Sequence, residues 1–91
     1  MRVTWDEAKR DRNLSDHGLD FADATEVFAG PTFTFEDDRF DYGEPRFVTL
    51  GVLRGTVVSI VHTETPRTIR VSSFRTATNN EQTIFFRQVP D

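Results

Sequence analysis

The sequence predicts one α+β domain over residues 1–91, in which an antiparallel sheet of three to five strands follows two helices and precedes a third. The centre of this prediction is a β-branched run at residues 57–61, which is too short for a helix. Thr65-Pro66 interrupts the run, because proline cannot donate to a β-ladder. A second β-prone run begins at Thr68, so the two segments are expected to pair as antiparallel neighbours.

Helix signals flank this sheet. Asp6 is expected to cap a first helix that stops at His17-Gly18, because glycine readily adopts the left-handed conformation of a C-terminal cap. Asp20 is expected to cap a second helix, whose apolar residues recur at helical spacing and face the core. The predicted elements are, in chain order, a strand at 2–5, helices at 7–16 and 21–28, strands at 32–35, 46–53, 56–63 and 67–74, and a helix at 76–88.

The alternation of side chains along the last strand predicts its two faces. Ile69, Val71 and Ser73 are expected to share one face of the sheet, and Arg70, Ser72 and Phe74 the other. All three helices are expected to pack against a single sheet face.

The charge is distributed unevenly along the chain. The net charge of −4 argues mildly against an ordinary nucleic-acid binder. Residues 1–44 hold five Lys and Arg against twelve Asp and Glu, a balance of −7, whereas residues 45–91 hold six Arg against three acids, a balance of +3. Ten of the eleven basic residues are Arg, which fits bidentate recognition of phosphate and equally fits a coding bias toward arginine.

Several classes of protein lack support. With no cysteine there is no disulfide, thiolate nucleophile or Cys-ligated metal, which suits a reducing cytosol. No apolar run predicts a membrane span or a signal peptide, so a cytoplasmic location is expected. The two histidines have no metal-ligand spacing, and no phosphate-binding glycine loop or serine-hydrolase motif occurs. We therefore expect neither metal nor cofactor, and the acidic segment 36–44 is expected to be solvated charge.

Histidines and arginines are the candidate functional residues. At a helix C-terminus, His17 can act as a general acid or serve only as a capping residue, and position alone favours the cap. His62 can face a groove or the surface of a hairpin, with equal support. The arginines at 46, 67, 70 and 75 can converge on phosphate or pair with the acids at 36, 37, 38, 44 and 64, again with equal support.

One pattern of residues extends over much of the chain. Its first part is Trp5-Asp6, Lys9, Asn13, His17-Gly18, Phe21, Ala24 and Val27-Phe28. Its second part is Glu44-x-Arg46, Gly51, Val61-His62-Thr63, Arg67, Arg70, Ser73, Arg75, Ala77 and Glu81. This pattern resembles the BrnT family, the toxins of BrnT/BrnA type II toxin–antitoxin pairs. The resemblance implies a RelE-like ribonuclease fold, metal-independent cleavage of RNA and inhibition of translation. It also implies a dimeric, DNA-binding antitoxin of the BrnA type. In the complex, only the antitoxin is expected to bind promoter DNA.

The resemblance also implies roles for individual residues. Attack of a 2′-hydroxyl on phosphate needs a proton acceptor, a proton donor and cations near the developing charge. Phosphate binding is expected from Arg46, Arg70 and Arg75, and further RNA contacts from Arg67 and His62. His17 is expected to be the acid or base, with Lys9, two helical turns away on the same face, as an electrostatic helper. Glu44 and Glu81 are alternative bases.

The segment after Arg75 departs from the family pattern. Residues 76–82 lack the basic residues usual there, and Phe85 and Phe86 stand where a tyrosine is usual. Fewer cations predict weaker phosphate binding. The alternative to a ribonuclease is thus a binding module of the same fold that holds the antitoxin without cleaving RNA. Without the resemblance, the residues support a small α+β protein whose arginines bridge to its acidic segment, facing Asp37, Asp38 and Asp41.

Overall fold

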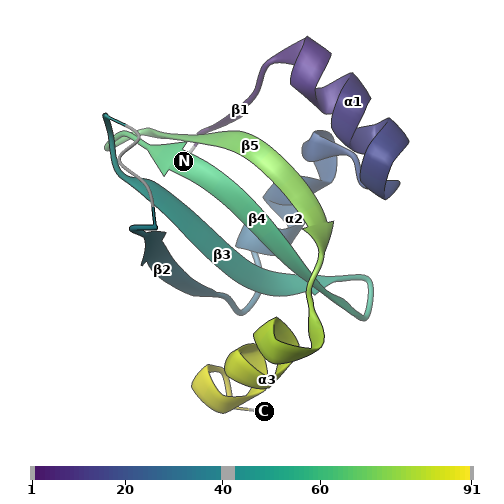
Figure 1. Ribbon diagram of the computed structural model, residues 1–91, viewed down its shortest axis with the longest axis vertical. Coiled ribbons are helices and arrows are strands. Elements are labelled where there is room, and N and C mark those ends of the chain that lie inside the picture. The colour runs from purple at the N-terminus through teal and green to yellow at the C-terminus, as the bar shows by residue number, and fades with distance from the viewer. Residues whose placement is uncertain (1, 40–42, 91) are drawn as a thin grey trace.

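The computed structural model describes residues 2–39 and 43–90, which form a five-stranded sheet with helices on both sides (Figure 1). The strands are β1 (Arg2–Thr4), β2 (Phe33–Asp37), β3 (Arg46–Leu53), β4 (Thr56–Glu64) and β5 (Thr68–Thr76). The helices are α1 (Glu7–His17), the 3₁₀ turn η1 (Phe21–Asp23), α2 (Ala24–Phe28) and α3 (Asn79–Gln88). The α+β class and the order of its elements are confirmed, and β3 has the predicted bounds.

The sheet is mixed rather than antiparallel. Its strand order is β1-β5-β4-β3-β2, so β5 lies second from one edge. Three of the pairings are antiparallel, but β1 runs parallel to β5, with Val3 opposite Ile69. This arrangement arises because the chain makes α1, α2 and three further strands before it returns beside its own beginning.

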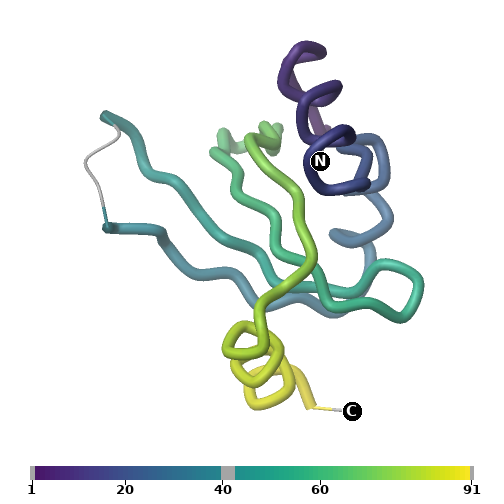
Figure 2. Tube along the Cα trace, turned by 45° about the vertical axis from the view of Figure 1, so that its right-hand side comes forward, coloured from purple at the N-terminus to yellow at the C-terminus, as the bar shows by residue number. Residues whose placement is uncertain are grey.

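Two hydrophobic clusters lie on opposite faces of the sheet. Val58 packs with Phe21 and Ala24 on one face, while its neighbour Val57 packs with Phe85 of α3 on the other. Successive strand residues point to opposite faces, so the two clusters are separated by the sheet itself. The expectation that all helices share one face is therefore wrong: α2 covers one face and α3 part of the other, as Figures 1 and 2 show.

A close approach of α2 to β3 depends on a glycine. A Cβ atom on Gly51 would lie 2.5 Å from Cγ1 of Val27, a distance that real Cβ contacts do not show. Because Gly51 has no side chain, Val27 is fully buried against the middle of the sheet.

A β-bulge changes the faces of β5. Val61 pairs with Ser73 but the next residue, His62, pairs with Val71, so Ser72 is an extra residue on β5. Beyond the bulge the alternation is shifted, and Phe74 joins Val71 in the cluster under α2. The predicted placement of Phe74 opposite Val71 is wrong for this reason. The same shift turns Arg75 toward the face that carries α3.

Helix ends follow their capping residues. Asp6 accepts a hydrogen bond from the backbone N–H of Ala8, and α1 ends at Gly18, whose φ of 71° is left-handed. The last helix begins later than predicted, at Asn79, because Thr76 still pairs with Val58 in the sheet and Thr78 is the N-cap. No helix in the described parts of the chain is long and apolar enough to cross a membrane.

Candidate functional site

Asn13 anchors α1 to the edge of β5. Its side-chain amide donates to the backbone carbonyl of Phe74 at 2.7 Å and accepts from the Phe74 N–H at 3.0 Å. The same Nδ2 donates to the carbonyl of Leu19 at 3.0 Å. β1 pairs only with residues 68–70 of β5. Farther along β5, at Phe74, the Asn13 amide makes the hydrogen bonds that a neighbouring strand would make. The buried Asn13 thereby fixes the distance between α1 and the bulge in β5.

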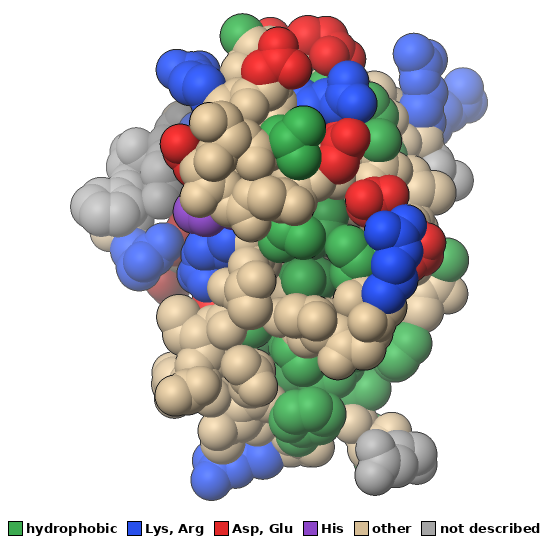
Figure 3. Space-filling view, turned by 90° about the vertical axis from the view of Figure 1, so that its right-hand side faces the viewer, with side chains coloured by type: hydrophobic (Ala, Val, Ile, Leu, Met, Phe, Trp, Pro, Cys, Tyr) green, Lys and Arg blue, Asp and Glu red, His purple; other side chains and the backbone are tan. Residues whose placement is uncertain are grey.

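A hollow, called here the α1 hollow, lies between α1 and the bulge. Its lining residues are Lys9, Arg12, Asn13, Asp16, His17, Ser72 and Ser73. Lys9 and His17 therefore do share one helix face, as their spacing predicts. Three side chains that can carry positive charge stand here against one carboxylate. Figure 3 shows blue Lys and Arg side chains beside a histidine on the surface of the molecule.

An ion-pair network holds the outer side of α1. Arg10 donates from Nε to Asp20 at 2.7 Å and from Nη2 at 3.0 Å, and it also pairs with Glu7 at 3.2 Å. The hydrogen bond from Arg10, followed by that from the Ala22 N–H, lowers the pKa of Asp20 to about 2. Arg10 is thus committed to the fold, whereas Lys9 and Arg12 are directed into the hollow.

Arg75 forms a two-point ion pair with Glu81. Nη1 lies 2.7 Å from Oε1 and Nη2 lies 3.0 Å from Oε2, while Nη1 also donates to the Thr76 carbonyl at 3.2 Å. Burial alone raises the pKa of Glu81, but the hydrogen bonds from Arg75 and from the Thr78 N–H outweigh it, so the pKa is lowered. Both partners are therefore charged and held in one geometry at the start of α3.

Arg46 and Arg70 share a sheet face with Arg75. Arg46 lies two residues before Val48, which packs under α3, and Arg70 lies between Ile69 and Val71 of the opposite face. The register places β4 alone between the two arginines, since Phe47 pairs with His62 and Thr63 with Arg70. Their backbones are thus two strand spacings, about 10 Å, apart. Arg67 is exposed at the β4–β5 turn, near Arg70 and away from α3.

Arg75 stands farther along the sheet than the other two. It pairs with Ser59, whereas Arg70 pairs with Thr63, so four residues of β4 separate them, about 13 Å. The three arginines are therefore spread along one face of the sheet and do not start from a common point.

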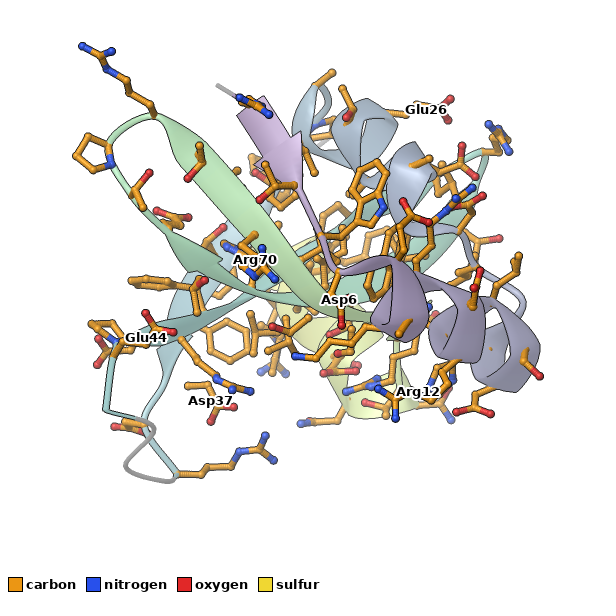
Figure 4. The ribbon with its side chains drawn as sticks, turned by 90° about the horizontal axis from the view of Figure 1, so that it is seen from above. Asp6, Arg12, Glu26, Asp37, Glu44 and Arg70 are labelled. Carbon is orange, nitrogen blue, oxygen red and sulfur yellow. The ribbon has the colours of Figure 1, made fainter. Side chains whose placement is uncertain are left out.

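A second depression, called here the acidic groove, lies on the same face between β2 and the start of α3. Its charged residues are Glu36, Asp37, Asp38, Arg39, Arg75 and Glu81, and its apolar floor is made by Phe35, Val48, Val61 and Ile84. Glu36 pairs with Phe47 in the strand register, so its side chain points to the opposite face, and three carboxylates thus stand against two guanidinium groups. Asp37 is bound by Arg39 at 2.9 and 3.0 Å and also pairs with Arg46 in the strand register. In the projection of Figure 4, Asp37 and Glu44 lie on one side of Arg70 and Arg12 on the other.

Of the arginines expected to bridge to the acidic segment, Arg46 stands opposite Asp37 in the strand register. Arg75 instead binds Glu81 of α3, and Asp37 is bound by Arg39 of the acidic segment itself. Asp41 lies outside the described residues. Glu44, proposed as an alternative base, is exposed at the beginning of β3 rather than near the α1 hollow.

His62 lies in the core, where it cannot reach an RNA strand. It is fully buried, its Nε2 lies 2.7 Å from Oγ1 of Thr49, and its ring packs against Phe28 and Phe47 with centroids 5.3 and 6.0 Å away. Burial lowers the pKa of His62, an effect that Glu64 opposes from 3.5 Å. Both predicted positions for His62, facing a groove or on the surface of a hairpin, are therefore wrong, and we remove it from the expected RNA contacts.

Within residues 2–39 and 43–90, no three His, Cys, Asp or Glu side chains lie close enough together to hold a metal ion. The carboxylates of the acidic groove are instead engaged in part by Arg39 and Arg75.

Sequence reasoning missed two contributors to the site. Asn13 matches the family pattern, which gives it no structural role, and Arg12 is not part of that pattern. In a helix with few apolar residues, a polar residue between the apolar positions indicates a buried hydrogen bond, which points to Asn13. Residue 12 is three positions from Lys9 and is hence on the same side of the helix.

The comparisons with known proteins agree with this architecture. Residues 5–81 match the model of a family described as the ribonuclease toxin BrnT of type II toxin–antitoxin systems. The crystal structure of the Brucella abortus ribonuclease toxin BrnT is similar, with a TM-score of 0.70 and 29% identity over 87% of this chain and 99% of that chain. No curated protein sequence matches the chain. Since the family model covers most of its length, the chain belongs to the BrnT family of ribonuclease toxins of type II toxin–antitoxin systems.

Proposed function

We propose that this protein is an endoribonuclease toxin that cleaves RNA without a metal ion and thereby inhibits translation. The observation that carries the proposal is the α1 hollow, where Lys9, Arg12 and His17 meet the bulge of β5. RNA binding is dominated by contacts to phosphate, and in this hollow, unlike the acidic groove, cationic side chains outnumber acids.

The proposed chemistry needs groups that the site contains. The 2′-hydroxyl attacks the adjacent phosphate, so one group removes its proton and another protonates the leaving 5′-oxygen. His17 takes one of these roles, because an imidazole can accept or donate a proton near neutral pH. Lys9 lies in the same hollow and stabilises the charge that builds up on the phosphate oxygens.

Arginines on the sheet complete the proposed RNA surface. Arg70 and Arg75 project from the strand that forms the floor of the α1 hollow, and Arg46 projects from β3 on the same face. Guanidinium groups bind phosphate in a bidentate way, and here three strands set their spacing. The proposed path of the RNA runs from the α1 hollow across β5 toward Arg75.

Family membership implies an antitoxin protein as partner. We further propose that this partner is a dimeric, DNA-binding protein of the BrnA type. Promoter DNA would then be bound only through the complex, since the toxin itself carries a net charge of −4. The absence of cysteine supports a reducing, cytoplasmic location.

The test is cleavage of an end-labelled RNA by the purified chain in EDTA. We expect cleavage by the natural chain and a loss of about 10²- to 10³-fold in Arg75→Ala, because one stabilising donor group on the transition state is typically worth this much. Arg87→Ala is the matched control, since Arg87 is an exposed arginine in the last turn of α3. Full cleavage by Arg75→Ala would contradict the assigned site.

A second candidate is a binding module that holds the antitoxin without cleaving RNA. The Arg75–Glu81 pair favours it, because a carboxylate already occupies two donors of the key arginine. A folded chain that cleaves neither free RNA nor RNA on ribosomes, yet binds its antitoxin, would establish this function instead.

A further inference from the structure

Glu81 makes more contacts than a helix cap requires. Thr78 and Glu81 form a reciprocal capping box, in which the Thr78 N–H donates to Oε1 at 2.9 Å and the Glu81 N–H donates to the Thr78 hydroxyl at 3.2 Å. The same carboxylate binds Arg75 at two points, and the Ser59 hydroxyl lies 3.5 Å from Oε2. With its side chain only 15% exposed, Glu81 connects α3, β4 and β5 at one point.

We infer that Glu81 is a positioning residue, which aims the guanidinium of Arg75 at the phosphate, and that it is not the proton acceptor of the reaction. This inference rests on the proposed ribonuclease function.

The count of donors on Arg75 shows how the pair leaves room for phosphate. A guanidinium group has five N–H donors. Glu81 receives one from each Nη atom, and the Thr76 carbonyl receives the second from Nη1. Among the described residues no acceptor occupies Nε–H or the second N–H of Nη2. These two donors lie on one edge of the planar group, and such an edge binds two oxygens of a phosphate.

The contacts of Glu81 oppose a role as base. Both carboxylate oxygens already accept short hydrogen bonds from Arg75, and Oε1 also accepts from Thr78. Although burial works in the other direction, these bonds lower the pKa of Glu81 and so weaken it as a proton acceptor. The two-point pair with Glu81 instead holds the Arg75 guanidinium in a fixed direction toward the scissile phosphate.

The first test compares Glu81→Gln with Thr78→Ala. Glu81→Gln removes the charge and one acceptor for Arg75, whereas Thr78→Ala removes the cap hydroxyl but keeps the backbone N–H that binds Glu81. We expect kcat for RNA cleavage to fall about 10- to 100-fold in Glu81→Gln, the cost of a misplaced catalytic group, with KM nearly unchanged. The pH profile of kcat should keep its shape, and Thr78→Ala should keep its rate.

Two results of this comparison overturn the inference. Loss of the acidic limb of the pH profile in Glu81→Gln would make Glu81 the base. Equal losses in Thr78→Ala and Glu81→Gln, each scaling with a loss of thermal stability, would reduce Glu81 to a cap.

Non-additivity gives a sharper readout. A residue that acts through Arg75 has nothing to position once Arg75 is alanine. We therefore expect Glu81→Gln to change cleavage by less than about twofold in an Arg75→Ala background. A full additional loss in that background would contradict the inference.

A readout without cleavage separates this inference from the proposed function. The Nε–H of Arg75 can be followed by ¹⁵N NMR in the free chain and with a short 2′-O-methyl RNA, which cannot be cleaved by 2′-hydroxyl attack. We expect a rigid Nε that shifts with RNA in the natural chain and in Thr78→Ala, and a mobile Nε with a weaker shift in Glu81→Gln. An equally rigid Nε in Glu81→Gln overturns the inference whether or not the natural chain cleaves RNA; absence of cleavage alone counts against the proposed function.

Discussion

The α1 hollow and the acidic groove lie close together on the molecule, but they differ in charge and in the interactions that hold them in place. The hollow brings Lys9, Arg12 and His17 together, although all three come from the acidic half of the chain. The groove contains Glu81, which comes from the basic half. Folding therefore redistributes the charge, and the balance of each half of the sequence does not describe the surface that a partner meets.

The two regions are also built differently. Hydrogen bonds from one buried amide, Asn13, hold the hollow together, and leave its cations available to a ligand. In the groove, Arg39–Asp37 and Arg75–Glu81 form ion pairs, and the second pair leaves one edge of the Arg75 guanidinium open to a ligand. A polyanion is therefore expected in the hollow and along β5 as far as Arg75, and repulsion is expected from the carboxylates on the β2 side of the groove.

The largest expected effect is on catalysis in the hollow. His17→Ala should reduce RNA cleavage about 10²- to 10⁴-fold, the usual contribution of a general acid or base. The fold should survive, since His17 is exposed at the end of α1. Asp38→Ala, in the groove, serves as control and should keep cleavage within about twofold. Comparable losses in both variants would remove the distinction between the two regions.

A smaller effect is expected from the anchor of the hollow. Asn13→Asp preserves shape but replaces two N–H donors with a carboxylate oxygen facing the carbonyls of Leu19 and Phe74. The free energy of unfolding should fall by about 1–3 kcal/mol, the cost of buried polar groups left without partners. Urea denaturation measures it, with the exposed Asn80→Asp as control. An unchanged midpoint would mean that α1 does not depend on this amide.

Acid should destabilise the protein through His62. Its pKa is lowered by burial in the folded chain, so below the ordinary value of 6.5 the unfolded chain binds a proton that the folded chain does not. Stability should therefore decrease as pH falls from 6.5 toward the folded pKa, by up to about 1.4 kcal/mol per pH unit. The lowered pKa of Asp20 adds a further loss of stability as the pH falls from 3.8 to about 2. The same pH dependence in His62→Gln as in the natural chain, measured by urea denaturation, would assign the effect to other groups.

The smallest expected effect separates the two regions by electrostatics alone. Lys9→Gln should weaken binding of a 2′-O-methyl RNA severalfold and reduce the salt slope by about 0.7, the value for one phosphate contact on a single strand. Asp38→Asn, in the groove, should strengthen binding slightly and leave that slope unchanged. Fluorescence anisotropy over a series of salt concentrations checks both, and equal slopes for Lys9→Gln and the natural chain would place Lys9 outside the RNA contact.

Local signals predicted much of the fold. The hairpin turn at Gly55 located β3 with its observed bounds, and Gly18 marked the end of α1 to within one residue. The bulge at Ser72 could not be predicted, because its cause is the pairing of β5 with β4 and not the order of side chains within β5. Phe74 was assigned to the wrong face as a result.

The site was predictable only in part. The spacing of Lys9 and His17 correctly placed both on one face of a helix. Sequence could not decide whether His62 was buried, since that depends on Phe28 and Phe47 closing over it from α2 and β3. Nor could it show that Arg75 pairs with Glu81. The pairing depends on α3 beginning at residue 79, whereas the sequence predicted a start at residue 76.

The most direct test of the account is to map the contact surface of a 2′-O-methyl RNA by NMR of the natural chain. We predict that the largest shifts occur at Lys9, Arg12, His17, Ser72 and Ser73, continue to Arg70 and Arg75, and spare Glu36 and Asp38. Shifts centred on the acidic groove, with the α1 hollow unaffected, would contradict the account.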